Sequence, residues 1–316
     1  MGTDGDGRRT GGNGVPAARG ADGAGADGPG AEGVRVEPVS IEVDGHRLAG
    51  SLHLPPVAPR RAIALHGATG VPQGYYGPLA RWLAAHRDAA VLTYDYRDFG
   101  RSATRRPRDS TASMADWGVA DQGAALDLVC ARFPDLPIEV VGHSLGGQYL
   151  PWHACASRVE RLVALCSGPA HWLAHPPRFM PRVVFFWFLG GPLATALAGY
   201  LPGRLLGLGV DLPRNVYRQW RRWCLSPDFN RRDWGAALPE PELGAFRGEL
   251  VLVAVADDEF VPPARVARLA ASYPAAARVR RVEVRPDELG LARIGHMKLA
   301  SARCAGAWPA LFGTSG

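Results

Sequence analysis

The chain has 316 residues, of which 47% are hydrophobic and 21% are charged, as in an ordinary packed globular protein. A chain of this length can bury enough apolar surface to fold without disulfides. Its five cysteines include no CxxC pair, which argues against a zinc site and for a reducing compartment. The net charge of +6 comes from scattered arginines rather than from a basic helix, so we expect no nucleic acid partner.

The first part of the chain has a composition of its own. Residues 1–33 are rich in Gly, Ala, Asp and Pro and contain no apolar segment of the kind found in a secretory signal. Because they offer nothing to bury, we predict a disordered tail. Together with the cysteine pattern, this composition leads us to expect a cytoplasmic protein.

Beyond residue 33, strand patterns alternate with helix patterns. Residues 34–54 have the pattern of two strands joined by a hairpin turn at Asp44-Gly45. The further predicted strands are 62–66, 89–94, 138–141, 159–166, 249–255 and 278–284, and the predicted helices are 75–87, 117–133, one after 142–147, 263–273 and one from about 298. Buried strands that alternate with helices predict an α/β fold, with a mostly parallel sheet covered on both faces.

The alternation is interrupted once. We predict that residues 34–170 and 246–316 form the core and that residues 171–245 form an inserted helical cap. Residues 183–203 carry no charge and are long enough to span a membrane. A span would place strands of one sheet on opposite sides of the membrane, and Gly190-Gly191-Pro192 interrupts the segment. We therefore predict two short apolar helices, with contact between the cap and lipid as an alternative.

One turn has the features of a nucleophile site. Gly142-His143-Ser144-Leu145-Gly146 has the pattern G-x-S-x-G between a predicted buried strand and a helix. So tight a turn strains the serine backbone and requires small residues two positions before and after it. It exposes the serine hydroxyl and directs the N–H groups of the following helix towards a developing oxyanion. We interpret Ser144 as a nucleophile rather than as a chance serine in a glycine-rich turn.

Several motifs accompany this turn. They are Ala68-Thr-Gly-Val-Pro-Gln73, Asp95-Tyr-Arg97, Asp116-Trp-Gly118, Gly142 to Gln148, Gly199-Tyr-Leu-Pro202, Asp211-Leu-Pro213, and Trp220 with Trp223. Together they resemble the α/β-hydrolase superfamily over about residues 62–316. A closer likeness is to bacterial α/β hydrolases related to the serine aminopeptidases. The resemblance implies the α/β-hydrolase fold and a Ser-His-acid triad, and it names no substrate.

In this fold the acid and then the histidine follow the serine along the chain. No other histidine follows the late acids, so His296 is our candidate base; the alternative is a loop histidine without a role. Asp257, Asp258 and Glu259 all follow the strand 249–255. Asp258 is favoured, because it stands four residues before a proline, a spacing usual in the fold. The other acids could instead cap the following helix.

Other site residues follow from the same framework. We expect the oxyanion to be held by the backbone N–H groups of Ala68 and Leu145, with Thr69 as an alternative to Ala68. The predicted substrate-binding residues are Thr69, Trp172 and Trp187, because the aromatic cap suggests an apolar acyl or alcohol group. The alternative is that these rings only pack the cap helices together.

Two positions depart from the family pattern. Asp98 stands where the family usually has glycine, which predicts a reshaped loop after the strand 89–94. Pro151 lies within the predicted helix that follows Ser144. It removes a helix hydrogen bond there and should kink the helix.

The sequence therefore predicts a serine hydrolase that needs no metal or organic cofactor and cleaves a small-molecule acyl ester. Thioester cleavage, acyl transfer and peptidase activity stay open, because only the acceptor and leaving group differ. The alternatives of other classes are a non-catalytic ligand-binding protein and a membrane-anchored lipase. A dehalogenase is disfavoured, because that reaction requires a carboxylate in place of Ser144. The sequence gives no basis for an oligomeric state.

Overall fold

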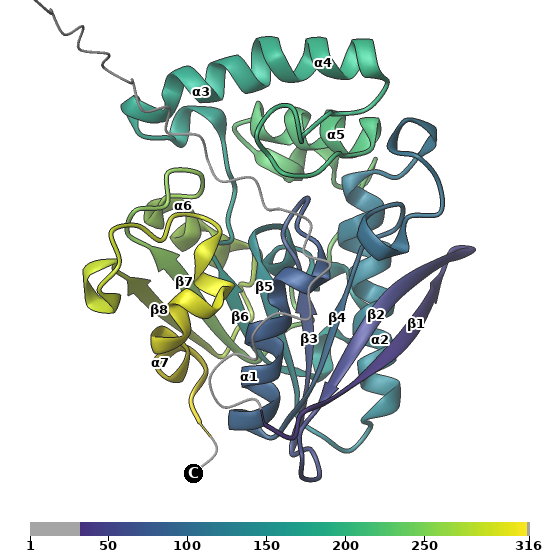
Figure 1. Ribbon diagram of the computed structural model, residues 1–316, viewed down its shortest axis with the longest axis vertical. Helices are drawn as coiled ribbons and strands as arrows, with labels where there is room; N and C mark the ends of the chain where they lie inside the picture. Colours follow the sequence, from purple (N-terminus) through teal and green to yellow (C-terminus); the bar gives the residue numbers. More distant parts are fainter. Residues whose placement is uncertain (1–31, 315–316) are drawn as a thin grey trace, which may run out of the picture.

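The computed structural model describes residues 32–314. The predicted disordered tail therefore lies outside the described residues, except for its last two positions. Eight strands form one sheet in the order β1-β2-β4-β3-β5-β6-β7-β8, with helices on both faces and a helical layer above one edge (Figure 1).

The sheet is antiparallel only at one side. The strands β1 (Arg35–Val43) and β2 (His46–Leu54) form the predicted hairpin, and β2 pairs antiparallel with β4. All other pairs are parallel; they involve β3 (Arg61–His66), β4 (Ala89–Tyr94), β5 (Ile138–His143), β6 (Val159–Leu165), β7 (Glu249–Val255) and β8 (Arg278–Val284). The predicted α/β fold with a mostly parallel sheet is confirmed.

Alternate residues of the central strands pack on opposite faces of the sheet. On one face, Val140 belongs to the same buried cluster as Leu126 of α2 (Gln122–Arg132). On the other face, Val141 belongs to a cluster with Leu83 of α1 (Gly77–Arg87) and Trp308 of α7 (Trp308–Phe312). Both faces are covered, which explains why the strands are continuous apolar runs.

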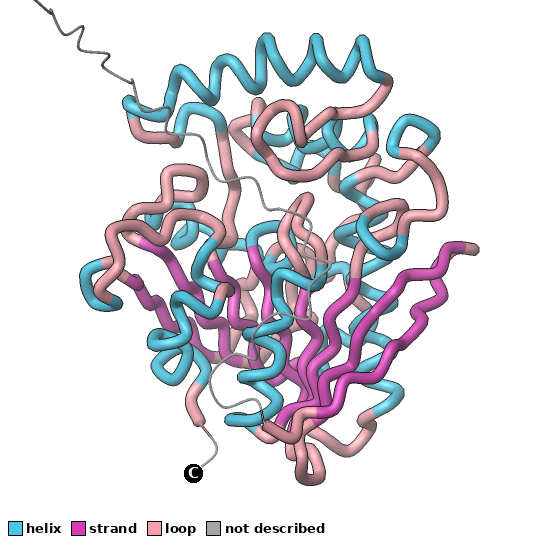
Figure 2. The backbone as a smooth tube through the Cα atoms, in the orientation of Figure 1, coloured by secondary structure: helices cyan, strands magenta, loops and turns pink. Residues whose placement is uncertain are grey.

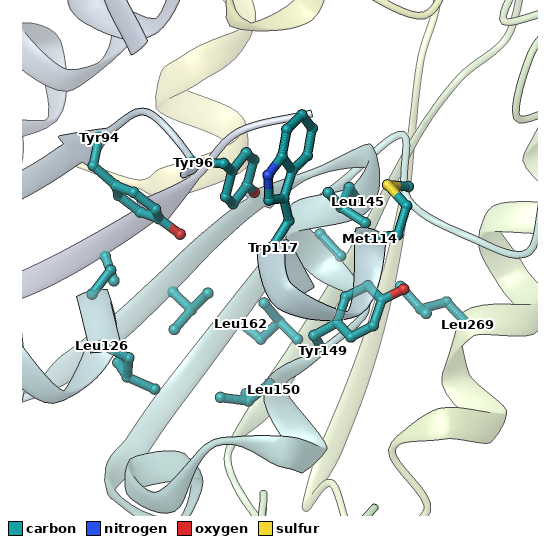
Figure 3. Close-up of a cluster of buried hydrophobic side chains, with 14 of the residues drawn as sticks. Tyr94, Tyr96, Met114, Trp117, Leu126, Leu145, Tyr149, Leu150, Leu162 and Leu269 are labelled. Carbon is teal, nitrogen blue, oxygen red and sulfur yellow. The ribbon is translucent and has the colours of Figure 1, made fainter. Parts of the chain in front are cut away.

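Aromatic side chains fill much of the core on the α2 side (Figure 3). Tyr96 stacks on Trp117 with ring centroids 5.0 Å apart, and the Trp117 indole donates a hydrogen bond to the carbonyl of Arg97. Gly118 allows the close approach of Tyr149, because an added Cβ would lie 2.6 Å from the tyrosine ring. This packing supports the segment that carries Ser144, because Leu145 is the next residue and Tyr149 follows soon after in the same segment.

The helix predicted after Ser144 is absent. The chain instead forms three short 3-10 turns, Ser144–Gly147, Leu150–Trp152 and Ala154–Arg158. Pro151 has no N–H to donate and clashes with a helical turn before it, while its carbonyl accepts a hydrogen bond from the N–H of Glu242 at 2.8 Å. The predicted helix kinked at Pro151 is therefore wrong.

Two later predicted helices are also shorter than expected. The first consists of α6 (Pro263–Arg268) and a 3-10 turn, Leu269–Ser272. The helix predicted from residue 298 consists of 3-10 turns before α7 begins.

The loop after β4 places Asp98 in a left-handed backbone conformation. The φ angle of Asp98 is +55°, a region that aspartate tolerates better than most residues. Its buried carboxylate accepts a hydrogen bond from the Ser110 hydroxyl at 2.7 Å and pairs with Arg105. The side chain thus stabilises a backbone conformation that glycine would adopt freely.

Residues between β6 and β7 form the layer above the carboxyl ends of the parallel strands (Figures 1 and 2). It contains α3 (Met180–Val184), a π-helical turn (Phe185–Gly190), α4 (Gly191–Ala198) and α5 (Arg214–Cys224). We keep the name cap for residues 171–245.

The cap differs from the prediction of two short helices. Residues Pro177–Ala198 form one continuous helix, the single helix of the described residues that is long and apolar enough to cross a membrane. The π-helical turn widens the helix just before Pro192, which relieves the clash of the proline ring with the preceding turn. Gly191 admits the neighbouring α5, because an added Cβ would lie 2.2 Å from the Tyr217 hydroxyl.

We predict that the fold loses stability when the pH falls below neutral. Burial lowers the pKa of His53 and His153 to about 4 and of His143 to about 3, and it also lowers that of His66. These histidines stay neutral in the folded chain but take up protons when unfolded, so their stabilising effect, complete above about pH 6.5, is lost as the pH falls towards 4. In this range, each histidine lowers the free energy of unfolding by up to about 1.4 kcal/mol for every pH unit.

Asp121 opposes this trend, because burial raises its pKa to about 6. Burial raises the pKa of Asp95 as well, and these two carboxyls are outnumbered by the four histidines. The melting temperature should fall by several degrees between about pH 7.5 and about pH 5.5. A melting temperature that is constant or higher at the lower pH would contradict the assignment of neutral buried histidines.

Candidate active site

The structure brings the three predicted triad residues into contact. His296 Nε2 lies 3.0 Å from Ser144 Oγ, and His296 Nδ1 lies 2.8 Å from Asp258 Oδ2. Ser144 directly follows β5, Asp258 follows β7, and His296 follows β8. Because these strands are parallel, the segments that follow them begin at the same edge of the sheet.

Ser144 has the strained backbone expected of the turn. Its φ angle is +53°, in the left-handed region that non-glycine residues rarely adopt. A Cβ added to Gly142 would lie 2.3 Å from the carbonyl oxygen of Gly146. A Cβ added to Gly146 would lie 2.1 Å from the carbonyl oxygen of His66. The glycines therefore allow the backbone contacts that hold the serine in place.

Asp258 is fixed in orientation by its own loop. Its Oδ1 accepts hydrogen bonds from the N–H groups of Phe260 at 2.8 Å and Val261 at 2.9 Å, which leaves Oδ2 for His296. The carboxylate is buried, at 3% exposure. Burial also raises the pKa of the adjacent Cys166 thiol, and the charge of Asp258 raises it further.

The two neighbouring acids have other partners. Asp257 accepts hydrogen bonds from the N–H groups of Ile294 at 3.1 Å and Gly295 at 2.8 Å, so it holds the loop that carries His296. Glu259 pairs with Arg178 of the cap and with Arg293, and its hydrogen bond with Arg178 lowers its pKa. Neither acid contacts the imidazole of His296 in the described contacts.

A chain of hydrogen bonds links the loop after β3 to the loop of His296. The N–H of Ala68 donates to the Tyr76 hydroxyl at 2.8 Å, and this hydroxyl lies 2.9 Å from His143 Nδ1. His143 Nε2 lies 2.9 Å from the His296 carbonyl oxygen. Burial lowers the pKa of His143 to about 3 and raises that of Tyr76. Both side chains are therefore neutral, and each can donate one proton along the chain.

This chain changes the predicted oxyanion hole. Because the N–H of Ala68 is already bonded to Tyr76, it is not free for an oxyanion. Thr69, the alternative donor, lines a small pocket beside Ser144 together with Leu145. Of the three predicted donors, Thr69 and Leu145 line the pocket, and they remain the candidates for binding an oxyanion. Leu145 lies in a single 3-10 turn, Ser144–Gly147, rather than in a helix, so the expected contribution of a helix dipole is absent.

The pocket has a largely apolar lining. Its walls include Met114, Tyr149, Trp220, Trp223, Phe229 and Phe260. The predicted Trp172 and Trp187 are not among the lining residues. Trp187 is buried behind Trp220, with ring centroids 5.0 Å apart, and Trp172 packs against Phe188. The tryptophans that the cap contributes to the pocket are instead Trp220 and Trp223.

One group of described residues could approach a metal ion, namely His143, Cys166 and His296. Both ring nitrogens of His143 already have hydrogen-bond partners, and both of His296 contact the other triad residues. Burial raises the pKa of the Cys166 thiol, which disfavours the thiolate that a metal would bind. The donors are thus committed to protein partners.

The structure has the α/β-hydrolase fold, and comparisons with known proteins agree with this fold. Residues 58–204 match the family model described as serine aminopeptidase, S33. The match covers slightly less than half of the chain, and the α/β-hydrolase fold that the sequence predicted is confirmed by the structure and by solved structures. No protein of curated function matches the sequence.

Solved structures share the fold at low sequence identity. An esterase of Pyrococcus furiosus is 14% identical, with 88% of each chain covered and a TM-score of 0.52. A thermostable carboxylesterase from a metagenomic library is 18% identical, covering 86% of this chain and 84% of its own, with a TM-score of 0.53. A membrane phospholipase A, described as a bacterial virulence factor, is 16% identical, covering 88% and 86%, with a TM-score of 0.52.

We predict that Gly146→Ala disrupts the turn at Ser144. The new Cβ would meet a backbone carbonyl, which cannot move aside as a flexible side chain can, so the free energy of unfolding should fall by about 3 kcal/mol. Gly74→Ala is the matched control, because no atom lies within 4 Å of an added Cβ there. It should change stability by less than about 0.5 kcal/mol. Equal denaturant midpoints for the two variants would contradict the close contact.

Proposed function

We propose that the protein is a serine hydrolase that cleaves esters of small apolar molecules, with Ser144 as nucleophile, His296 as general base and Asp258 as the acid of the triad. The observation that carries the proposal is the continuous contact from the Ser144 hydroxyl through the His296 imidazole to the Asp258 carboxylate. A serine hydroxyl is a poor nucleophile near neutral pH, and such a base activates it.

Each group then has one role in the reaction. Ser144 Oγ attacks the acyl carbon while His296 Nε2 takes its proton, and Asp258 stabilises the imidazolium. The N–H groups of Thr69 and Leu145 bind the oxyanion, each contributing about 3 kcal/mol to transition-state stability. His296 returns the proton to the leaving alcohol, and water then repeats the sequence on the acyl-enzyme. Acid is released and the serine is restored.

The pocket lining favours an uncharged ester over a peptide. An aminopeptidase must hold the positively charged amino terminus of its substrate, for which a carboxylate is the natural partner. The residues that line the pocket include no acidic side chain, and Glu259 is already paired with two arginines. Met114, Trp220 and Phe260 instead offer an apolar surface to an acyl or alcohol group.

We predict that Ser144→Ala lowers kcat on a short p-nitrophenyl ester by about a thousandfold or more, because it removes the nucleophile. Ser157→Ala is the control: Ser157 is exposed and lies in the 3-10 turn Ala154–Arg158. The control should retain full activity. Undiminished turnover by Ser144→Ala, with an unchanged circular dichroism spectrum, would sink the proposal.

We predict a separate effect for Asp257→Asn. Asparagine has one acceptor oxygen in place of two, so the loop of His296 loses a hydrogen bond and the imidazole is less well positioned. Because small misplacements of catalytic groups are costly, kcat should fall about tenfold with KM nearly unchanged.

The matched control for this variant is Glu259→Gln, in the same loop, whose charged partners are exposed arginines. It should leave kcat within about twofold. If both substitutions reduced kcat equally, the specific role of Asp257 in holding the loop would be wrong.

A further inference from the structure

The helix Pro177–Ala198, here called the cap helix, lies on the outer side of the cap, farthest from the sheet (Figure 1). Its buried positions are Val183, Trp187, Gly191 and Thr195, which recur every four residues and form one stripe. This stripe packs on α5, where Trp187 stacks with Tyr217 and contacts Trp220. The helix is therefore held to the cap along one side only.

The opposite side of the cap helix is apolar and exposed. Its exposed large side chains are Val184, Phe185, Phe188, Leu189, Leu193 and Leu197, at 44% to 79% exposure. They recur at intervals of three to four residues, as expected for one face of a helix. The flanking segments expose Leu173, Leu205 and Leu208 as well. So large an apolar surface marks an interaction site.

The charged residues of the cap helix itself, and those at its two ends, are mostly arginines. Residues 161–210 contain no Asp or Glu. Exposed Arg178 and Arg182 lie near the start of the cap helix, and exposed Arg204 follows its end. Arg214 donates a hydrogen bond to the carbonyl of Gly199, directly after the helix. Two of these arginines have carboxylate neighbours, since Arg178 pairs with Glu259 and Arg204 lies 3.9 Å from Asp211.

We propose that this face docks on an anionic membrane surface, with the cap helix lying in the plane of the headgroups. The apolar face would enter the acyl-chain boundary, and the arginines at both ends would contact lipid phosphates. A membrane span would require the buried stripe of Trp187 and Thr195 to lose its contacts with α5. The helix would therefore lie on the membrane rather than across it. A second copy of the chain fits poorly, because a two-fold contact would bring arginines together.

Docking here would bring the candidate active site close to the lipid. Trp220 lines the pocket beside Ser144, and its ring also packs against Phe186 and Trp187 of the cap helix. One helix layer therefore separates the pocket from the proposed lipid contact. The docking itself does not depend on the hydrolase activity.

The test is co-sedimentation of full-length Ser144→Ala protein with vesicles, because this variant cannot act on the lipids by the proposed mechanism. Binding to phosphatidylcholine vesicles that contain phosphatidylglycerol should exceed binding to phosphatidylcholine alone by about tenfold, and added salt should weaken it. Adding Leu189→Glu and Leu197→Glu to this protein should reduce its binding to the anionic vesicles about tenfold.

The matched control carries Val36→Glu and Val57→Glu, at positions that are 46% and 56% exposed. Val36 lies at the start of β1 and Val57 in the loop before β3, at the end of the sheet opposite the cap (Figure 1). It should bind as the parent does. Equal binding by the two double variants, or no preference for anionic vesicles, would overturn the proposal. So would protein that resists an alkaline carbonate wash, which indicates a span, or a dimer in solution that the cap substitutions dissociate, which indicates a second copy.

Discussion

The contact between Ser144 and His296 joins residues that lie 152 positions apart in the chain. It forms because β5 and β8 are parallel members of one sheet and the segments that follow them begin at the same edge. The covered faces of the sheet fix the strands, and the glycines around Ser144 let the backbone take its left-handed turn. The position of the hydroxyl is thus a consequence of backbone packing rather than of its own side-chain contacts.

The histidine is positioned by more than its acid. Asp258 orients the ring, Asp257 holds the backbone before it, and His143 contacts its carbonyl oxygen. His143 is connected through Tyr76 to the N–H of Ala68, beside the proposed oxyanion donors. Burial keeps His143 and Tyr76 neutral, so this link does not change with pH near neutrality. It connects two sides of the site through fixed, directional hydrogen bonds.

Much of this arrangement could be predicted from the sequence. Apolar runs located the central strands, and G-x-S-x-G together with the order of acid and histidine located Ser144, Asp258 and His296. The choice of Ala68 failed because the bond between its N–H and the Tyr76 hydroxyl depends on side-chain direction, which local sequence does not specify. The choice of Trp187 failed for a similar reason: the side of the cap helix that faces α5 is decided by tertiary packing.

The two wrong helix predictions both concern helix-breaking residues. The sequence shows where these residues are, but not how strongly each one interrupts a helix. At Pro151 no helix forms, because its carbonyl accepts a hydrogen bond from the N–H of Glu242, which is distant in the sequence. Gly190-Gly191-Pro192 did less than expected, because a π-helical turn accommodates the proline and Tyr217 packs against the glycine. In both cases a distant contact determined how a helix-breaking residue acted.

The most direct measurement is to react the purified protein with a fluorophosphonate and to map the modified residue by mass spectrometry of its peptides. The account predicts a single covalent adduct on Ser144, and no adduct when His296 is replaced by alanine, because the hydroxyl then lacks its base. A folded protein that forms no adduct, or that is modified at another serine, would contradict it.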